Sequence, residues 1–244
     1  MPFNTDDEVW YACYGSNLDR QRLMCYIQGG MPRGGTVANP GCIDPTPPKR
    51  DAHRMINRRL YFARQAESWQ GGGVTFVETE PDAAGSLTHS RLYLITRQQF
   101  EHIFDQENDR DPTASLNAST NVPTNAPLSA HRNASTSSAA ATAIDFAALD
   151  RTGILDTAGG WYRRLLFLGE HDRRPIYTFT AADRQPNRPP SDAYLQTIIR
   201  GLRQTCPSLT PAAVAAYLID VIPFHTAVAQ ANRLVELASR ETDD

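Results

Sequence analysis

The sequence has few cysteines, and those it has lie far apart. No two of the four form a Cys-x-x-Cys pair, and they occur at Cys13, Cys25, Cys42 and Cys206. This spacing predicts reduced, mostly buried thiols rather than disulfides or a zinc-binding cluster. The six histidines are equally scattered. A metal site would therefore need ligands assembled from distant parts of the chain, and we expect no bound metal.

The sequence also lacks a large excess of charge of either sign and long hydrophobic runs. A formal net charge of -3 over 244 residues predicts neither a basic surface for nucleic acid nor an acidic tail. No apolar run approaches the length of a membrane span, and the acidic residues 2–8 contain no apolar stretch typical of a secretory signal. We therefore expect a cytoplasmic protein that binds neither nucleic acid nor membrane. Its oligomeric state is left open.

Short strand-like runs and fewer helices predict a mixed α and β domain. The runs are rich in Val, Ile, Tyr, Phe and Thr, and they are Val9–Tyr14, Leu60–Ala63, Val74–Glu78, Leu92–Thr96, Tyr162–Leu168 and Ile176–Thr180. Two clear helices are expected at about 97–108 and 192–204, and 41% hydrophobic residues are enough for a sizeable core.

Two segments stand apart from this domain. Residues from about 109 to 143 are dominated by Ala, Ser, Thr, Asn and Pro, and they include no Phe, Trp or Tyr. Such a composition buries too little apolar surface to offset ordering entropy, so we predict a disordered insertion. Residues 207–244 form a predicted helical C-terminal extension, in which Thr210-Pro211 begins one helix and a second covers about 226–239.

The first chemically suggestive motif follows the first predicted strand. The strand ends at Tyr14, breaks at Gly15-Ser16-Asn17, and passes into the helix-like segment Leu18–Ile27. Such a turn directs several backbone N–H groups into one small space, which suits a carboxylate or a developing oxyanion. A capped turn without a ligand would produce the same pattern.

A second candidate is a glutamate on an apolar helix face. In the helix expected from Arg97, helical spacing places Glu107 on one stripe with Phe100, Ile103 and Phe104. Burial of an unpaired carboxylate is costly and raises its pKa, so the position suits a general base and acid. The other interpretation is that Glu107, near the helix end, turns into solvent.

Several motifs, in this order, resemble the gamma-glutamylcyclotransferase-like superfamily. They are Tyr14-Gly15-Ser16-Asn17-Leu18, the segment Trp69–Val74, the strand Leu92–Thr96 leading to Asp105-Gln106-Glu107, then Gly160-Trp161-Tyr162 and Pro190-Ser191-Asp192-Ala193-Tyr194. The resemblance implies an α+β fold over residues 8–206, a mixed β-barrel with flanking helices. Two departures are plain: about fifty residues separate Glu107 from Tyr162, and residues 28–57 have no counterpart in the family. Tyr162 can lie beside Glu107 only if the insertion loops out.

The resemblance implies intramolecular aminolysis of a gamma-glutamyl amide, which gives 5-oxoproline and a free amine without a cofactor. Glu107 would then be the general base and acid. The turn residues Gly15, Ser16, Asn17 and Leu18 would bind the glutamyl group, with the hydroxyls of Tyr162 and Tyr194 beside it. Tyr14 suits a structural role as well as ligand contact.

Other functions fit the residues less well. A serine hydrolase using Ser16 lacks the Gly-x-Ser-x-Gly elbow. The glycine cluster Gly29–Gly35 is not followed by the Lys-Ser/Thr of a phosphate loop. The main alternative is a non-catalytic small-molecule-binding protein with the same pocket, since a fold does not fix an activity. A further possibility is the same chemistry with a different leaving amine.

Overall fold

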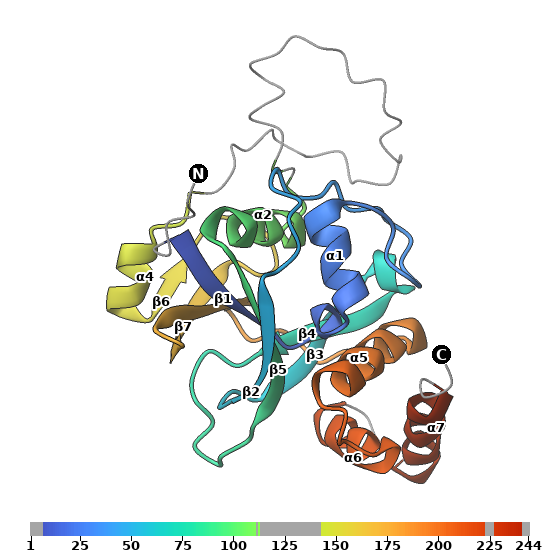
Figure 1. Cartoon of the computed structure of the whole chain (residues 1–244). Helices are drawn as coiled ribbons and strands as arrows, with labels where there is room; N and C mark the ends of the chain where they lie inside the picture. Colours follow the sequence, from blue (N-terminus) through green and yellow to red (C-terminus); the bar gives the residue numbers. More distant parts are fainter. Residues whose placement is uncertain (1–6, 111, 113–142, 223–226, 241–244) are drawn as a thin grey trace.

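The computed structural model describes residues 7–110, 112, 143–222 and 227–240. Apart from residues 109, 110, 112 and 143, the predicted insertion lies outside the described residues. Figure 1 shows the mixed arrangement of helices and strands that the sequence predicts.

Six strands form one mixed sheet. Across the sheet they are β2 (Arg50–Ile56), β5 (Thr88–Thr96), β1 (Glu8–Cys13), β8 (Arg174–Thr180), β7 (Arg164–His171) and β6 (Ile154–Asp156). β1 pairs antiparallel with β5 and parallel with β8. The α+β class is therefore confirmed, and each predicted strand overlaps an observed one.

The expected barrel is not closed within the described part of the chain. β2 and β6 are the two edges of the six-stranded sheet, because β3 (Leu60–Ala66) and β4 (Gly72–Val77) pair with each other as a separate ribbon. The ribbon is fastened to β8 by one threonine: the Thr180 hydroxyl accepts from the Val77 N–H at 3.2 Å and donates to the Val77 carbonyl at 2.6 Å.

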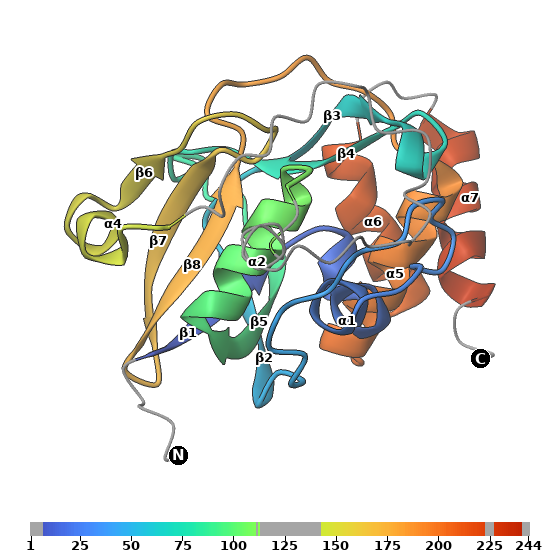
Figure 2. The same ribbon diagram turned by 90° about the horizontal axis from the view of Figure 1, so that it is seen from above.

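Helix α2 (Arg97–Glu107) covers one face of the sheet, as Figure 2 shows. It begins with a capping box, in which Thr96 and Gln99 each satisfy the backbone N–H of the other. Its apolar stripe packs on strand aromatics, with Phe100 5.7 Å from Tyr11 between ring centroids. The predicted helix and its apolar face are both present, and the last residue of α2 is Glu107.

The remaining helices lie around the sheet. They are α1 (Arg20–Gln28), which follows the short 3-10 turn η2 (Ser16–Leu18), then α4 (Phe146–Thr152), α5 (Asp192–Thr205), α6 (Pro211–Val221) and α7 (Ala227–Arg240). Figures 1 and 2 place α5, α6 and α7 together at one side of the molecule and α4 at the other. A Cβ at Gly201 of α5 would lie 2.3 Å from the Asp19 backbone nitrogen, so only glycine lets α5 pack this closely on the turn after β1.

The sequence missed β2, β6 and α4. β2 lies in the segment that had no counterpart, and its residues Arg-Asp-Ala-His-Arg-Met-Ile are mostly polar because it is an exposed edge strand. Among the described residues, none of the helices combines the length and the apolar character that crossing a bilayer would require.

Candidate functional site

A pocket of about 980 Å³ opens where the ends of β1, α2 and β4 meet α1 and α5. All of the residues predicted for the site line this pocket except Leu18; those lining it are Tyr14, Gly15, Ser16, Asn17, Glu107, Tyr162 and Tyr194. Leu18 is fully buried, and its backbone N–H donates to the Gly15 carbonyl at 3.0 Å. It closes the turn and has no free donor for a ligand.

The turn after β1 is fixed by a close approach of β4. A Cβ at Gly15 would lie 2.1 Å from the Thr75 hydroxyl and 3.1 Å from the Tyr194 hydroxyl, so a side chain at this position would push the turn away from both. No described residue accepts a hydrogen bond from the backbone N–H of Ser16 or Asn17. These two donors sit in the pocket wall and suit an anionic oxygen.

Glu107 lies at the end of α2 with its side chain half-buried in the pocket. Its Oε1 accepts a hydrogen bond from Asn17 Nδ2 at 2.9 Å. Burial raises the pKa of the Glu107 carboxyl above its ordinary value of 4.5, and the opposing effects of Arg22, Tyr26 and Asn17 do not cancel that rise. The carboxylate is thus held in place by a neutral amide and is more basic than an exposed glutamate.

Arg22 is a pocket residue that the sequence reasoning missed. The guanidinium is buried on α1, donating to Asn39 Oδ1 and to the Tyr26 hydroxyl at 2.6 Å each. It also stacks over the Tyr26 ring at 4.2 Å. Arg22 and Tyr26 are four residues apart and so share one helix face, which is the signal that could have found this buried cation.

Tyr162 reaches the pocket through a contact made by Asn108. The Asn108 side chain accepts from the Tyr162 N–H at 2.9 Å and donates to the Phe104 carbonyl at 3.0 Å. A Cβ at Gly160, which has a positive φ of 82°, would lie 2.0 Å from Asn108 Oδ1. The chain after the insertion therefore returns to the end of α2, and Tyr162 lines the same pocket as Glu107.

We expect Asn108→Ala to destabilise the packing of the chain around Tyr162 against the end of α2. The change leaves the buried N–H of Tyr162 and the carbonyl of Phe104 unpaired, at a cost of about 1–3 kcal/mol in the free energy of unfolding. Urea denaturation measures the loss. Asn187→Ala, at an exposed position, is the control and should cost no more than about 0.5 kcal/mol. Equal losses for the two variants would contradict this structural role for Asn108.

The tyrosine hydroxyls are engaged by the protein itself. Tyr14 donates to the Phe179 carbonyl at 2.7 Å, and Tyr162 donates to the Thr75 carbonyl at 3.0 Å. The Tyr194 hydroxyl accepts from the Thr75 N–H at 3.1 Å. These contacts join the pocket walls, so the direct role expected for the tyrosines toward a ligand stays a prediction, and their positioning role is what the geometry supplies.

Among the described residues, the side chains spaced to hold a metal ion lie outside this pocket. Over the residues with described positions, the group of His, Cys, Asp and Glu side chains spaced to hold an ion is His53, His89 and Cys206, none of which lines the pocket.

Comparison with known proteins gives a partial match in sequence and a distant one in structure. No family model matches the chain. Histone deacetylase 5 of Arabidopsis thaliana is 32% identical over 210 residues, which cover 80% of this chain and 28% of that protein. The chain thus spans little more than a quarter of the curated relative that it matches.

Among solved structures, the fold is similar to a gamma-glutamyl cyclotransferase, with a TM-score of 0.42, 11% identity, and 94% of this chain and 98% of that chain covered. A gamma-glutamyl cyclotransferase specific to glutathione from yeast is similar with a TM-score of 0.31, 10% identity, and 96% and 97% of the two chains covered.

Proposed function

We propose that the protein is an enzyme of the gamma-glutamylcyclotransferase type, which cyclises a gamma-glutamyl amide to 5-oxoproline and releases an amine. The observation that carries this proposal is the Glu107 carboxylate, held by Asn17 in a pocket, with a raised pKa. The unpaired N–H groups of Ser16 and Asn17 lie in the wall of the same pocket.

The reaction needs one proton carrier and no water. The substrate's α-amino nitrogen attacks its own gamma-carbonyl carbon, which forms the ring C–N bond and places negative charge on the carbonyl oxygen. Glu107 accepts the proton that the amine loses and returns it to the leaving nitrogen as the gamma C–N bond breaks. Since the nucleophile belongs to the substrate, holding it folded supplies much of the rate.

The pocket offers a partner for each charged part of such a substrate. Arg22 suits the α-carboxylate, because a guanidinium matches a carboxylate in both charge and geometry. The N–H groups of Ser16 and Asn17 suit the carbonyl oxygen as it gains charge. Pro32, Val37 and Pro40, from the segment without a family counterpart, also line the pocket and would contact the leaving amine.

The protein's own residues complete this chemistry, so we propose no metal or cofactor in the pocket. The substrate would be a small molecule of the cytoplasm. The wall formed by residues 32–40 would determine which amine leaves. The reaction would be classed with carbon–nitrogen lyases and acyltransferases.

Mass spectrometry of the products tests the proposal. We expect purified protein to release 5-oxoproline from at least one member of a panel of gamma-glutamyl amines, gamma-glutamyl dipeptides and glutathione. The N-acetylated form of the same substrate is the control, since its nitrogen is no longer a nucleophile and should give no product. Release of glutamate instead of 5-oxoproline would indicate hydrolysis by water and would contradict the proposed mechanism.

A further inference from the structure

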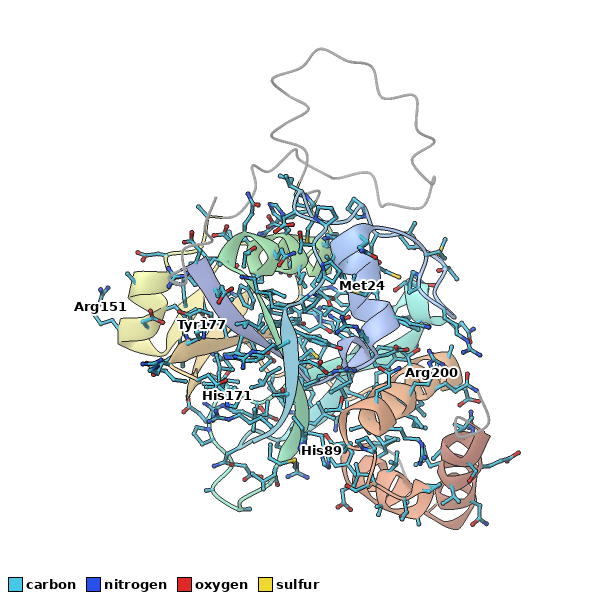
Figure 3. The ribbon with its side chains drawn as sticks, viewed as in Figure 1. Met24, His89, Arg151, His171, Tyr177 and Arg200 are labelled. Carbon is cyan, nitrogen blue, oxygen red and sulfur yellow. The ribbon has the colours of Figure 1, made fainter. Side chains whose placement is uncertain are left out.

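Three potential metal ligands from distant parts of the chain meet away from the pocket. His53 lies on β2, His89 on the neighbouring strand β5, and Cys206 directly after α5. His53 Nε2 is 3.1 Å from His89 Nδ1, and Cys206 Sγ is 3.7 Å from the same nitrogen. Figure 3 shows His89 on β5, on the side of the sheet where α5 and α6 pack.

These distances fit one tetrahedral ion. With Zn–N and Zn–S bonds of ordinary length, two ligand nitrogens lie about 3.4 Å apart and a nitrogen and a sulfur about 3.6 Å apart. The two distances to His89 Nδ1, 3.1 and 3.7 Å, differ from these values by only about 0.3 and 0.1 Å. The ligand atoms of all three residues lie within 4.8 Å of one another, so His53 and Cys206 need to approach each other by only about 1 Å. His53 is exposed and is free to make this small rotation.

The surroundings of the three side chains are compatible with the metal site that their geometry indicates. Partial desolvation lowers the pKa of both imidazoles, and His53 lowers that of His89 further, which favours the neutral ring that donates a lone pair to a metal. Burial raises the pKa of the Cys206 thiol, which makes it a poor nucleophile in the absence of a cation. A bound divalent ion would convert this thiol to a thiolate ligand.

We propose that His53, His89 and Cys206 form a binding site for a divalent transition-metal ion of the zinc class. Two nitrogens and one sulfur are the donor set that such ions prefer, and a fourth position stays open for water beside the exposed His53. The sequence had led us to expect no metal, because no two of these ligands are near each other in the chain.

The ion would join the sheet to the C-terminal helices. β2 is an edge strand, and the Tyr217 ring of α6 packs edge-on against His89 with ring centroids 4.8 Å apart. A metal held by β2, β5 and the end of α5 would fix this edge where the helices pack. The site is separate from the pocket, so the proposal stands whether or not the protein releases 5-oxoproline.

Titration of the metal-free full chain with Co²⁺ and Zn²⁺ tests the site. We expect one Co²⁺ per chain, with a thiolate-to-cobalt charge-transfer band and the strong visible bands of a tetrahedral ion. Zn²⁺ should displace Co²⁺ and raise the Tm. Cys206→Ser should lose the charge-transfer band, and His53→Ala should weaken binding at least about tenfold. Cys25→Ser is the control, since Cys25 lies on α1 outside the cluster, and it should keep the band.

Three results would overturn the proposal. The first is the absence of a charge-transfer band in wild-type protein that is folded by circular dichroism. The second is a band that persists in Cys206→Ser or that vanishes in Cys25→Ser, since another thiol would then be the ligand. His53 is exposed, so His53→Ala should fold normally; unchanged Co²⁺ affinity in this variant would also contradict the site.

Discussion

Glu107→Gln should lower the rate of 5-oxoproline release by about 10²- to 10⁴-fold, the usual contribution of a general base and acid. Glutamine keeps the oxygen that accepts the Asn17 amide hydrogen at 2.9 Å, so the end of α2 and the turn after β1 should stay in place. What is lost is the ability to take a proton from the substrate's amine. The measurement is kcat by mass spectrometry, with circular dichroism to establish that the variant is folded.

A second glutamate on the same helix provides the control. Glu101 is also half-buried on α2, and burial raises the pKa of its carboxyl as well. Its side chain accepts from the Ile144 N–H at 3.0 Å and does not line the pocket. Glu101→Gln should therefore keep full activity. If both variants lose activity equally, a general effect on α2 and not proton transfer would be responsible.

The Glu107→Gln variant also distinguishes an enzyme from a non-catalytic binding protein. An enzyme should bind the substrate in the Glu107→Gln form without turning it over. A non-catalytic protein with this pocket should bind the ligand in both forms and release no 5-oxoproline from either. Wild-type turnover that survives Glu107→Gln would overturn the role proposed for Glu107.

Local patterns made the central part of the fold predictable. The helical spacing of Phe100, Ile103 and Phe104 depends only on neighbouring residues, and all three are fully buried. Glu107, at the end of the same stripe, is half-buried in the pocket. Gly15, before Ser16 and Asn17, likewise predicted a sharp turn. The close approach of Thr75 that requires Gly15 was not visible, because Thr75 belongs to a strand sixty residues away.

The parts that escaped prediction depend on contacts between distant segments. Arg22 looks like an ordinary polar residue of an amphipathic helix until Asn39 and Tyr26 are seen to receive its hydrogen bonds. β2 is too polar to be recognised as a strand, because among the described strands it pairs with β5 alone and its other edge is exposed. Whether the sheet stays open or closes into a barrel also depends on which strand edges meet. The alternation of apolar and polar residues along a single strand does not encode that choice.

Arg22→Met should raise KM by about 10- to 100-fold, since a charged hydrogen bond to a carboxylate contributes about 1.5–3 kcal/mol. Methionine fills most of the space of the arginine stem but has no donor for the substrate's α-carboxylate, so binding should suffer more than kcat measured at its optimal pH. Arg20→Met is the control, because Arg20 begins the same helix and does not line the pocket.

The pH profile tells a binding role of Arg22 from a purely structural one. The Arg22 charge lowers the pKa of Glu107, so its removal should raise that pKa further above 4.5. Glu107 must be ionised to accept a proton, and the acidic limb of kcat/KM should therefore move to higher pH in Arg22→Met. Arg22→Lys keeps the positive charge, so the acidic limb of its kcat/KM profile should stay near that of the wild type. Its KM should still rise, because a single ammonium cannot reproduce the contacts to Asn39 and Tyr26. An unchanged KM and an unchanged acidic limb in folded Arg22→Met would mean that the α-carboxylate binds elsewhere.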